Sequence, residues 1–404
     1  MTTTNSRHDF LVFGAAGIQG RIVVRDLVER GYRVFASDLF ESDVERLCGR
    51  HRGLEGRALD LNQTEDLRSL VASVRPSVII NCAEMDWNLT VAHTALESGS
   101  HVVDLGSDIE MVAKQIAMHE AFAEKGLIAI AGCGSTPGIT DVMLEFAAEQ
   151  LDRLERVEVG FVWDSNEQTF VVPFSMDTII SEFLDPAAFV HQDQWMTVRP
   201  MESVRRRKFK GIENQRCFAA PHEEVYTYYH FYRDRGLRSV RFSSGFPDHS
   251  FDRITKLCAS LDERGNVHLD EGPVHRSRLT RALERRHPMP DQYIERENLW
   301  VIVDGTVGAV PRRIRMECLV PPIAGWESAG CNVDTGFPAS IIGQMILNGD
   351  IGARGSFSPG PVVPWRAFFE ELERRGLRIY RDGRPWYIDQ PISDVARRSW
   401  PVYV

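Results

Sequence analysis

The first 150 residues alternate short apolar runs with longer segments in which apolar residues recur at helical spacing. We predict six strands from these runs, at residues 8–13, 33–37, 56–59, 77–82, 101–104 and 127–131. Runs such as Val78-Ile79-Ile80 are apolar at every position, which is typical of parallel strands that are covered on both faces. Right-handed crossovers through the intervening helices then give a doubly wound Rossmann sheet.

Beyond about residue 150 the pattern becomes strand-rich, with apolar and polar positions alternating. The predicted strands here are residues 156–163, 203–210, 237–243, 299–308 and 312–319. Such alternation favours an antiparallel or mixed sheet with one solvated face.

Helices are expected from about Pro247, over 338–347 and over 365–374. The last two helices are expected to pack back onto the first domain. The charged stretch 262–297 is expected to form a flexible excursion or lid.

The bulk composition restricts the class of protein. A chain of 404 residues exceeds the usual size of one hydrophobic core, so two domains are expected. The net charge of −10 argues against a nucleic-acid partner, and the basic run 205–208 reads as a solvated strand or turn. The seven cysteines are scattered without a Cys-x-x-Cys pair, so neither a disulfide framework nor a metal site is expected.

Two further features of the sequence indicate the compartment. No apolar stretch is long enough to cross a bilayer, and the polar start at residues 1–7 lacks the apolar segment of a signal peptide. We therefore expect a cytoplasmic protein with no membrane partner.

A glycine-rich loop follows the first predicted strand and opens a helix. Gly14 allows a tight turn, Gly17 lets the backbone approach a pyrophosphate, and Gly20 lets the helix and the strand pack closely. The N–H groups at the helix start would bind phosphate. The predicted cofactor-binding residues of this loop are Gly14, Ala16, Gly17, Ile18, Gln19 and Gly20. The alternative is an ordinary glycine-rich turn.

Asp38 ends the second predicted strand, 18 positions beyond Gly20. A carboxylate there would hydrogen-bond the ribose hydroxyls of adenosine and repel a 2′-phosphate, so we favour NAD over NADP. A surface aspartate is the alternative.

Two further strand ends are predicted to contact the cofactor. Asp60 and Leu61 would flank the adenine, and Cys82 and Ala83 would lie near the nicotinamide. Asp60 could instead orient a turn, and Cys82 could be a small buried apolar residue.

The segment 131–141 leaves the sixth strand and enters a helix near Thr140 or Asp141. The N–H groups of this helix start could hold the carboxylate of a substrate. A turn that crosses between domains is the equal alternative.

Several motifs together resemble the saccharopine dehydrogenase-like oxidoreductases, and within them the chain is most similar to lysine 6-dehydrogenase. The motifs are residues 14–20, 119–126, 132–138, 181–186, 335–340 and 368–376. Ser135 and Thr136 replace an acidic residue that saccharopine-forming members tend to carry before Pro-Gly. Residues 241–245, Arg-Phe-Ser-Ser-Gly, replace the common Arg-Tyr-Pro-Gly-His pattern, so the substrate stays open.

The resemblance implies an α/β fold in which a Rossmann domain carries an inserted α+β catalytic domain that also makes subunit contacts. The expected domains are 1–140 for the dinucleotide, 141–335 for substrate and oligomerisation, and 336–404 for C-terminal helices that return to the Rossmann domain. A homo-oligomer, dimer or larger, is expected from the resemblance alone.

The resemblance also implies chemistry at a C–N bond of an amino acid, which needs a general base near neutral pH. Asp104 ends the fifth strand and is the first candidate for base or ammonium anchor, with capping of the next turn as the alternative. By resemblance Glu182 would orient an amino group and Arg241 would hold a substrate carboxylate. An ordinary helical glutamate and an outward-facing arginine are the alternatives. His222 and His249 could exchange protons.

Three functions fit these features. The first is an NAD(P)-dependent dehydrogenase acting on the CH–NH group of an amino acid, such as oxidative deamination of lysine. The second is a reductive enzyme of polyamine or opine type that couples an amine to a carbonyl compound. The third is a non-catalytic NAD sensor.

Overall fold

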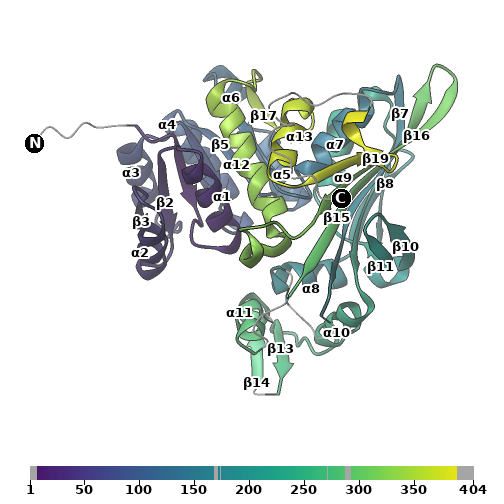
Figure 1. The fold of residues 1–404 in the computed structure, drawn as a ribbon, viewed down its shortest axis with the longest axis horizontal. Helices are drawn as coiled ribbons and strands as arrows, with labels where there is room; N and C mark the ends of the chain where they lie inside the picture. Colours follow the sequence, from purple (N-terminus) through teal and green to yellow (C-terminus); the bar gives the residue numbers. More distant parts are fainter. Residues whose placement is uncertain (1–6, 168–171, 173, 271, 287–292, 389–404) are drawn as a thin grey trace, which may run out of the picture. The chain divides into compact units, whose positions relative to one another are not determined.

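The computed structural model describes residues 7–167, 172, 174–270, 272–286 and 293–388 (Figure 1). The chain divides into two compact units. Among the described residues, unit 1 takes 7–146 and 332–375, and unit 2 takes the described part of 147–331 together with 376–388. Each unit is built on its own sheet.

Unit 1 contains a seven-stranded sheet in the order β17-β6-β5-β4-β1-β2-β3, and its strand pairs are parallel. The strands are β1 Phe10–Phe13, β2 Val34–Asp38, β3 Glu55–Ala58, β4 Val78–Asn81, β5 His101–Asp104, β6 Ile128–Ile130 and β17 Gly355–Phe357. All six strands predicted for this region are present, so the doubly wound sheet is confirmed. The seventh strand, β17, comes from the C-terminal part of the chain and was not predicted.

Helices connect and cover these strands. They are α1 Ile18–Glu29, α2 Glu41–Arg50, α3 Thr64–Val74, α4 Asn88–Ser98, α5 Ile109–Ile116, α6 His119–Glu124, α12 Val333–Asn348 and α13 Trp365–Arg374, with a short 3₁₀ turn at Met85–Trp87. The helix α7, Ile139–Ala148, continues past the boundary into unit 2.

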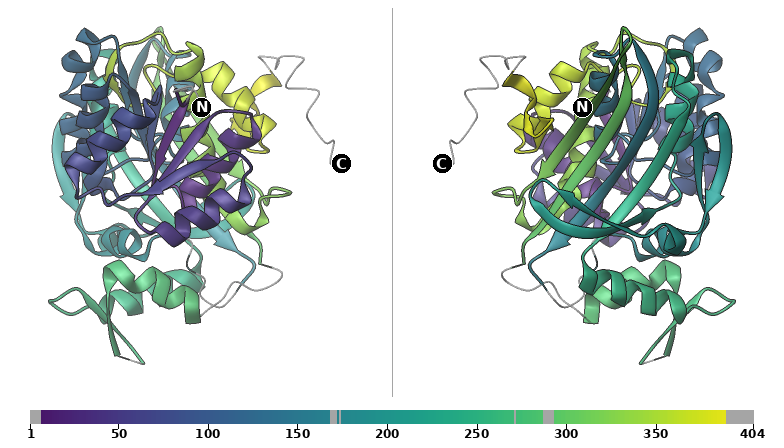
Figure 2. Two further views of the ribbon diagram at one scale, coloured as in Figure 1. Left: turned by 90° about the vertical axis from the view of Figure 1, so that its left-hand side faces the viewer. Right: turned by 90° about the vertical axis from the view of Figure 1, so that its right-hand side faces the viewer.

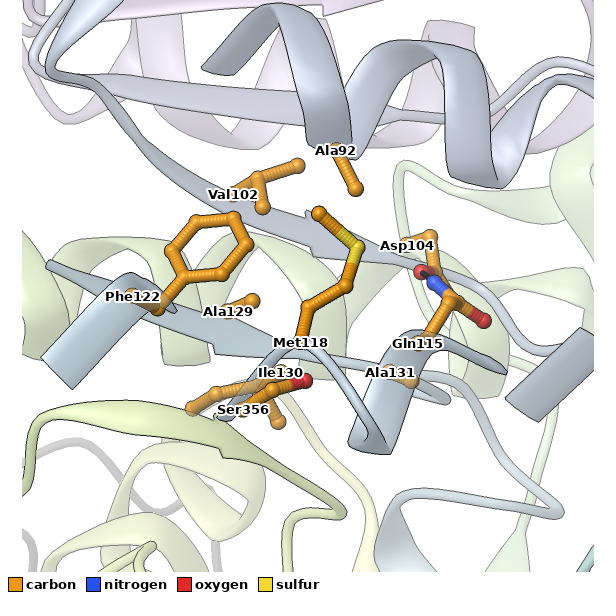
Figure 3. Close-up of a pocket in the computed structure, with 10 residues that line it drawn as sticks. All are labelled: Ala92, Val102, Asp104, Gln115, Met118, Phe122, Ala129, Ile130, Ala131 and Ser356. Atoms are coloured by element: carbon orange, nitrogen blue, oxygen red, sulfur yellow. Dashed lines mark hydrogen bonds between the residues drawn. The ribbon is translucent and has the colours of Figure 1, made fainter. Parts of the chain in front are cut away.

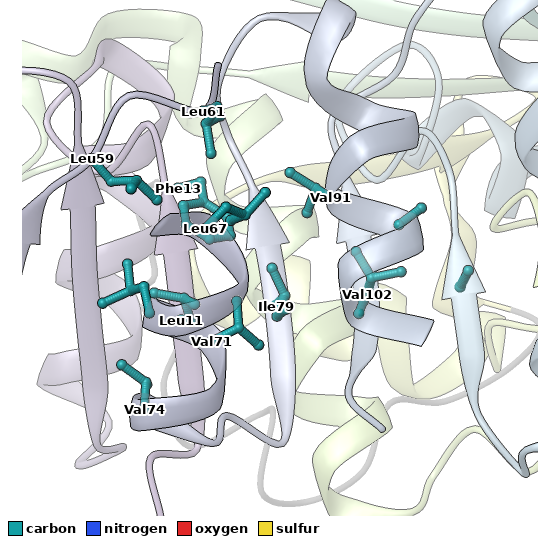
Figure 4. Close-up of a cluster of buried hydrophobic side chains, with 14 of the residues drawn as sticks. Leu11, Phe13, Leu59, Leu61, Leu67, Val71, Val74, Ile79, Val91 and Val102 are labelled. Carbon is teal, nitrogen blue, oxygen red and sulfur yellow. The ribbon is translucent and has the colours of Figure 1, made fainter. Parts of the chain in front are cut away.

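One face of the sheet carries the buried apolar cluster in Figure 4. Leu67, Leu70, Val71 and Val74 recur at i, i+3, i+4 and i+7, so α3 presents one apolar side to the strands. Leu11 on β1 and Ile79 on β4 meet that side (Figure 4). The helical spacing of α3 and the apolar strands therefore explain this layer.

The helix α12 packs against α1 and contacts β4 and β5. A buried polar group ties the end of α13 to α1: Asp26 receives two hydrogen bonds from Arg375, at 3.0 and 2.9 Å, and one from Ser340 at 2.7 Å. The helices expected at 338–347 and 365–374 are thus present, although α12 starts at Val333 and Pro338 lies inside it.

Unit 2 contains a ten-stranded mixed sheet with the path β10-β11-β12-β7-β15-β16-β18-β19; β8 pairs with β12, and β9 pairs with β8. Its strands are β7 Arg153–Ser165, β8 Ala187–His191, β9 Gln194–Val198, β10 Arg205–Phe209, β11 Ile212–Ala219, β12 Ser239–Phe246, β15 Glu295–Val307, β16 Val310–Val320, β18 Arg378–Arg381 and β19 Arg384–Pro385. Only β12 and β7 pair in parallel. The right-hand view of Figure 2 shows the long teal and green strands of this sheet side by side.

The helices of unit 2 are α8 Met176–Leu184, α9 Glu224–Tyr232, α10 Asp248–Ala259 and α11 Arg276–Arg286. An aromatic cluster joins them to the sheet, in which Phe183 of α8 lies 4.6 Å from Phe218 and 5.6 Å from Phe246, between ring centroids. The predicted α/β class with a second, mixed-sheet unit is therefore confirmed.

The structure gives the elements of two stretches for which the sequence allowed only a general expectation. The stretch 262–297 forms the hairpin β13 Asn266–Leu269 and β14 Gly272–His275, then α11, with residues 271 and 287–292 outside the described residues. Of the expected C-terminal segment 336–404, residues 376–388 add β18 and β19 to the sheet of unit 2, because Ile379 pairs with Cys318 of β16. Residues 389–404 lie outside the described residues. In the part of the chain that the structure describes, no helix is long and apolar enough to cross a membrane.

Candidate functional site

The glycine-rich loop of unit 1 has the backbone geometry that a phosphate-binding turn requires. Gly14 adopts φ +63°, and a Cβ atom there would come within 2.6 Å of the backbone of Cys82 and Ala83. A Cβ at Gly20 would collide with the carbonyl oxygen of Gly14. The N-cap of α1 is Gly17, which has no side chain to occupy the first N–H groups of the helix. These residues fit a dinucleotide pyrophosphate.

Asp38 lies beside this loop. Its Oδ2 accepts a hydrogen bond from the N–H of Ala16 at 2.9 Å, and its Oδ1 accepts one from Leu39 at 2.8 Å. The carboxylate is therefore held in place, with lone pairs left for two further donors. Leu39 and Phe40 are about half exposed, so an apolar surface follows the carboxylate.

The remaining predicted cofactor residues have different surroundings. Gln19 donates to Asn332 at 2.8 Å, while its Oε1 has no hydrogen-bond partner. Asp60 accepts the N–H and the side-chain amide of Asn62, both at 2.9 Å, so it orients a turn. Leu61 is buried in the apolar cluster of unit 1, and Ala83 packs against the same cluster. Ile18 is 37% exposed at the start of α1.

Cys82 is a half-buried thiol at the end of β4. Burial and, to a smaller extent, the nearby carboxylate of Asp104 raise its pKa, so it is a poor nucleophile near neutral pH. It lies with Gly14 and Ala83, and the structure thus brings these three predicted positions together.

The helix start after residue 138 is occupied by its own chain. The N–H groups of Ile139 and Thr140 donate to the carbonyls of Gly134 and Ser135, and the N–H of Gly138 donates to Asp141 at 3.0 Å. These groups are therefore not available to a substrate carboxylate, and a closed turn is the simpler reading.

Asp104 lies at the end of β5, where it was expected, and it is buried and accepts three hydrogen bonds. Its oxygens accept hydrogen bonds from the N–H groups of Gly106 and Gly132, at 2.9 and 3.0 Å, and from the amide of Gln115 at 2.5 Å. Burial raises its pKa despite these donors. The carboxylate joins β5 to the loop after β6.

Asp104 and Gln115 also line a small cavity in unit 1 (Figure 3). Its other walls are mostly apolar, and it has room for roughly one water molecule. This cavity is too small for an amino acid.

Glu182 on α8 lies in a buried polar cluster of unit 2. It is 3% exposed, and its Oε2 has no hydrogen-bond partner among the residues that the structure describes. Burial raises the pKa of Glu182 to about 7, and the nearby His222 and Ser244 reduce the shift. A carboxyl group with this pKa exchanges protons near neutral pH.

His222 is the second titratable side chain of this cluster. Its Nδ1 is hydrogen-bonded to the carboxylate of Glu224, and its ring stacks on Phe242 with centroids 3.8 Å apart. Burial disfavours the charged ring, but Glu224 and Glu182 outweigh it and raise the pKa of His222. The sequence suggested His222 as a proton exchanger, whereas the role of Glu224 was missed because no spacing rule places a loop histidine against a helix start.

Arg241 is not part of this cluster. It lies on β12, where residues alternate between the two faces of the sheet. Phe242 and Ser244 point to the face that carries Glu182, so Arg241 points to the other face. It stacks on Phe189 at 4.7 Å.

His249, the other histidine considered, lies in the first turn of α10 as expected. Burial lowers its pKa, and its Nε2 has no hydrogen-bond partner.

The parallel sheet and the glycine-rich loop define a dinucleotide-binding fold. Residues 10–130 match the saccharopine dehydrogenase NADP binding domain, and residues 134–377 match the saccharopine dehydrogenase C-terminal domain. The chain therefore belongs to the saccharopine dehydrogenase family of NAD(P)-linked oxidoreductases, as the motifs indicated.

Curated relatives and a solved structure agree with this assignment. The chain is 26% identical to carboxyaminopropylagmatine dehydrogenase of Synechocystis, over 82% of this chain and 84% of that protein. It is 23% identical to carboxynorspermidine synthase of Vibrio alginolyticus, over 48% of this chain and 49% of that protein. The match thus spans about half the length of the second relative.

Among solved structures, saccharopine dehydrogenase (L-Glu forming) of Saccharomyces cerevisiae has the same fold, with a TM-score of 0.73. The match covers 93% of this chain and 99% of that chain at 13% identity. Both curated relatives are named for carboxylated amines of polyamine type and neither is a lysine 6-dehydrogenase.

Proposed function

We propose that this protein uses NADH to couple a primary amine to an amino-acid aldehyde through a new C–N bond. The names of the two relatives support this choice, because each describes an amine that carries a carboxylated substituent. The observation that carries the proposal is the buried carboxyl group of Glu182, whose Oε2 accepts no hydrogen bond from the described residues, close to His222, whose pKa is raised.

The chemistry explains why such a pair is useful. An alkylammonium must lose a proton before its nitrogen can attack a carbonyl carbon. Loss of water then gives a protonated imine: counted from the ammonium, the nitrogen gives up two protons, and the carbonyl oxygen leaves with two protons as water. Reduction of the protonated imine gives a secondary amine, which takes one proton from solution. The bound dinucleotide supplies the hydride for this step.

Glu182 is proposed as the group that accepts the proton of the ammonium. A base works best when its pKa lies near the working pH, and burial brings Glu182 into that range. His222, held by Glu224 and stacked on Phe242, is proposed to donate its own proton to the carbonyl oxygen and to take the proton of Glu182 in its place. Asp104 is proposed as a positioning residue of unit 1, since its oxygens are used by Gly106, Gly132 and Gln115.

We also propose NAD rather than NADP as the cofactor. A 2′-phosphate would meet the carboxylate of Asp38, and Glu41 follows in the first turn of α2. The nearest arginine of that helix, Arg46, pairs with Asp43 at 3.2 Å. Like charges at this position disfavour a phosphate. Titration with NADH and NADPH tests this, and tighter binding of NADPH would refute it.

The activity is tested with purified protein, NADH, agmatine and an amino-acid semialdehyde whose adduct carries a carboxyaminopropyl group. We expect the reduced cofactor to be consumed only when both reactants are present, and mass spectrometry to show the secondary amine. Glu182→Gln should lower kcat/KM by about 10²–10⁴-fold. The same change at Glu65, whose side chain is 86% exposed, is the matched control.

The second candidate is oxidative deamination of an amino acid such as lysine, which the motifs 119–126 and 132–138 favour. It predicts reduction of NAD by the amino acid alone. A protein that binds NADH and is silent with every amine and aldehyde in both directions would refute catalysis and favour the non-catalytic sensor.

A further inference from the structure

A hairpin and a helix project from unit 2 beside α8, the helix that carries Glu182 (Figure 1). The hairpin consists of β13 and β14, and α11 follows it directly. We name residues 262–286 the arm, of which residue 271 lies outside the described residues. The arm belongs to the charged stretch 262–297, which the proposed function does not use. Because α11 packs against α8, the arm can act on Glu182 through that helix.

One arginine of the arm binds one side of α8. Arg276, the first residue of α11, pairs through its Nε with the carboxylate of Asp177. Its Nη2 donates to the carbonyl oxygen of Asp177 at 2.7 Å and to the hydroxyl of Ser181 at 2.6 Å. These two residues are four positions apart, so they lie one turn apart on the same side of the helix. The guanidinium therefore spans the turn of α8 that precedes Glu182.

The arm also binds the first turn of α8. Thr280, one turn further along α11, accepts a hydrogen bond from the N–H of Met176 at 2.9 Å through its hydroxyl. That N–H is one of the groups at a helix start that have no partner within the helix. Leu279 and Leu283 give α11 a buried apolar side. The start of α8 is thus fixed by α11 in both position and rotation.

Arg276 is itself held in place by the arm. Its N–H donates to the carbonyl oxygen of Gly265 at 2.9 Å. Gly265 lies in the turn before β13, where Asp262 accepts hydrogen bonds from the N–H groups of Arg264 and Asn266, both at 2.9 Å. The side chain of Arg276 is 23% exposed. The arm therefore presents an ordered guanidinium to α8, and an ordered guanidinium loses less conformational freedom for each hydrogen bond.

The rotation of α8 decides the surroundings of Glu182. Glu182 follows Ser181 directly, and one residue turns a helix by about 100°, so the side bound by the arm and the side of Glu182 are neighbours. Further along α8, the ring of Phe183 packs against Phe218 and Phe251. The burial of Glu182 and its closeness to His222 both require this placement of the helix.

We propose that Arg276 is a positioning residue, which holds α8 so that the carboxyl group of Glu182 meets His222 and the amine of the substrate. This inference rests on the proposed function of Glu182 as the group that accepts a proton. Arg276 acts through Asp177 and Ser181 and exchanges no proton itself. The charge that acts on Glu182 is that of His222, so loss of Arg276 changes the access of water to the carboxyl group and lowers its pKa.

Steady-state kinetics of Arg276→Gln with NADH, agmatine and the semialdehyde test the proposal. We expect kcat to fall by about 10–100-fold, because a misplacement of about 1 Å at the reacting groups has an effect of this size. The affinity for NADH should stay within about twofold of wild type, since the glycine-rich loop belongs to unit 1. Arg281→Gln is the matched control on the same helix, because that side chain is exposed, and its kcat should equal that of wild type. Arg276→Lys, which keeps the charge opposite Asp177, should recover part of the lost kcat.

The pH dependence separates positioning from a merely structural role. In Arg276→Gln the acid limb of the kcat/KM profile should move to lower pH by about one unit, because water reaches the carboxyl group of Glu182. In denaturant unfolding the variant should lose less stability than wild type as the pH rises through 7, for the same reason. Ser181→Ala removes one acceptor of the guanidinium and should show the same changes at smaller size, which gives a result even where Arg276→Gln does not fold.

Wild-type kcat and an unmoved acid limb in both variants would overturn the positioning role. So would a lower kcat with an unmoved acid limb, because the surroundings of Glu182 would then be intact without the arginine. Failure of the proposed function has a different signature, which is full activity of Glu182→Gln. In that event the unfolding profiles of Arg276→Gln and Ser181→Ala still decide whether the arm controls the burial of Glu182.

Discussion

Replacing Glu182 with glutamine should flatten the pH dependence of unfolding. The pKa of Glu182 is about 7 in the folded protein, against an ordinary value of 4.5. The folded state therefore holds this proton more tightly than the unfolded chain does. The stability that the proton contributes is fully present below pH 4.5 and is lost as the pH rises through 7.

The size of the effect follows from the same two values. Between pH 5 and pH 8 the wild type should lose about 2–3 kcal/mol that Glu182→Gln does not lose. His222 acts in the same direction, since its raised pKa also makes stability fall as the pH rises. Glu182→Gln removes one of the carboxylates that raise the pKa of His222, so the dependence of the variant's stability on pH should flatten further.

The assay is denaturant unfolding of wild type and variant at pH 5, 6, 7 and 8, followed by fluorescence. Glu65→Gln is the exposed control, and its profile should run parallel to that of wild type. Parallel profiles for Glu182→Gln and wild type would refute the reasoning, because they would show that Glu182 does not hold a proton in the folded state near neutral pH.

Three further predictions concern unit 1. Gly20→Ala should abolish NADH binding in titration, because its Cβ collides with the carbonyl oxygen of Gly14, and retained affinity would contradict this. Asp38→Ser should weaken NADH binding by about 1–3 kcal/mol and affect NADPH less; an equal loss for both cofactors would exclude a role of Asp38 in selectivity. Arg375→Leu should destabilise unit 1 by about 3–5 kcal/mol in thermal melts, because it leaves the buried carboxylate of Asp26 without its main partner, and an unchanged Tm would disprove that dependence.

Local features could be predicted where the physical cause of the structure lies within one short segment. The continuous apolar strands of unit 1 lie within a few residues of their predicted ends, because a strand buried on both faces needs apolar residues at every position. Trp365–Arg374 was predicted to the residue, since Pro364 and Gly376 bracket a strongly amphipathic segment. Short strands such as β9 and β18 give no comparable signal and were missed.

The candidate site likewise has features that the sequence predicts and features that it does not. The geometry of the glycine-rich loop and the place of Asp38 beside Ala16 could be expected, because strand, turn and helix are adjacent in sequence. The environment of Glu182 could not, because burial raises its pKa only when α8, β12 and the loop before α9 are packed together. For Asp104 the position at the end of β5 was predicted, but its three hydrogen-bond donors were not.

The sequence by itself determined the Rossmann unit, the phosphate-binding turn and the membership of an oxidoreductase family, because each depends on apolar patterns and short motifs that can be recognised along the chain. The tertiary structure decided which side chains share an environment: it joined Glu182 to His222, put Arg241 on the opposite face of the same sheet, and added β17 and β18 from the end of the chain to two different sheets. The physical reason is that pKa shifts, charge pairing and strand neighbours arise from contacts between distant segments, which hydrophobic periodicity does not encode.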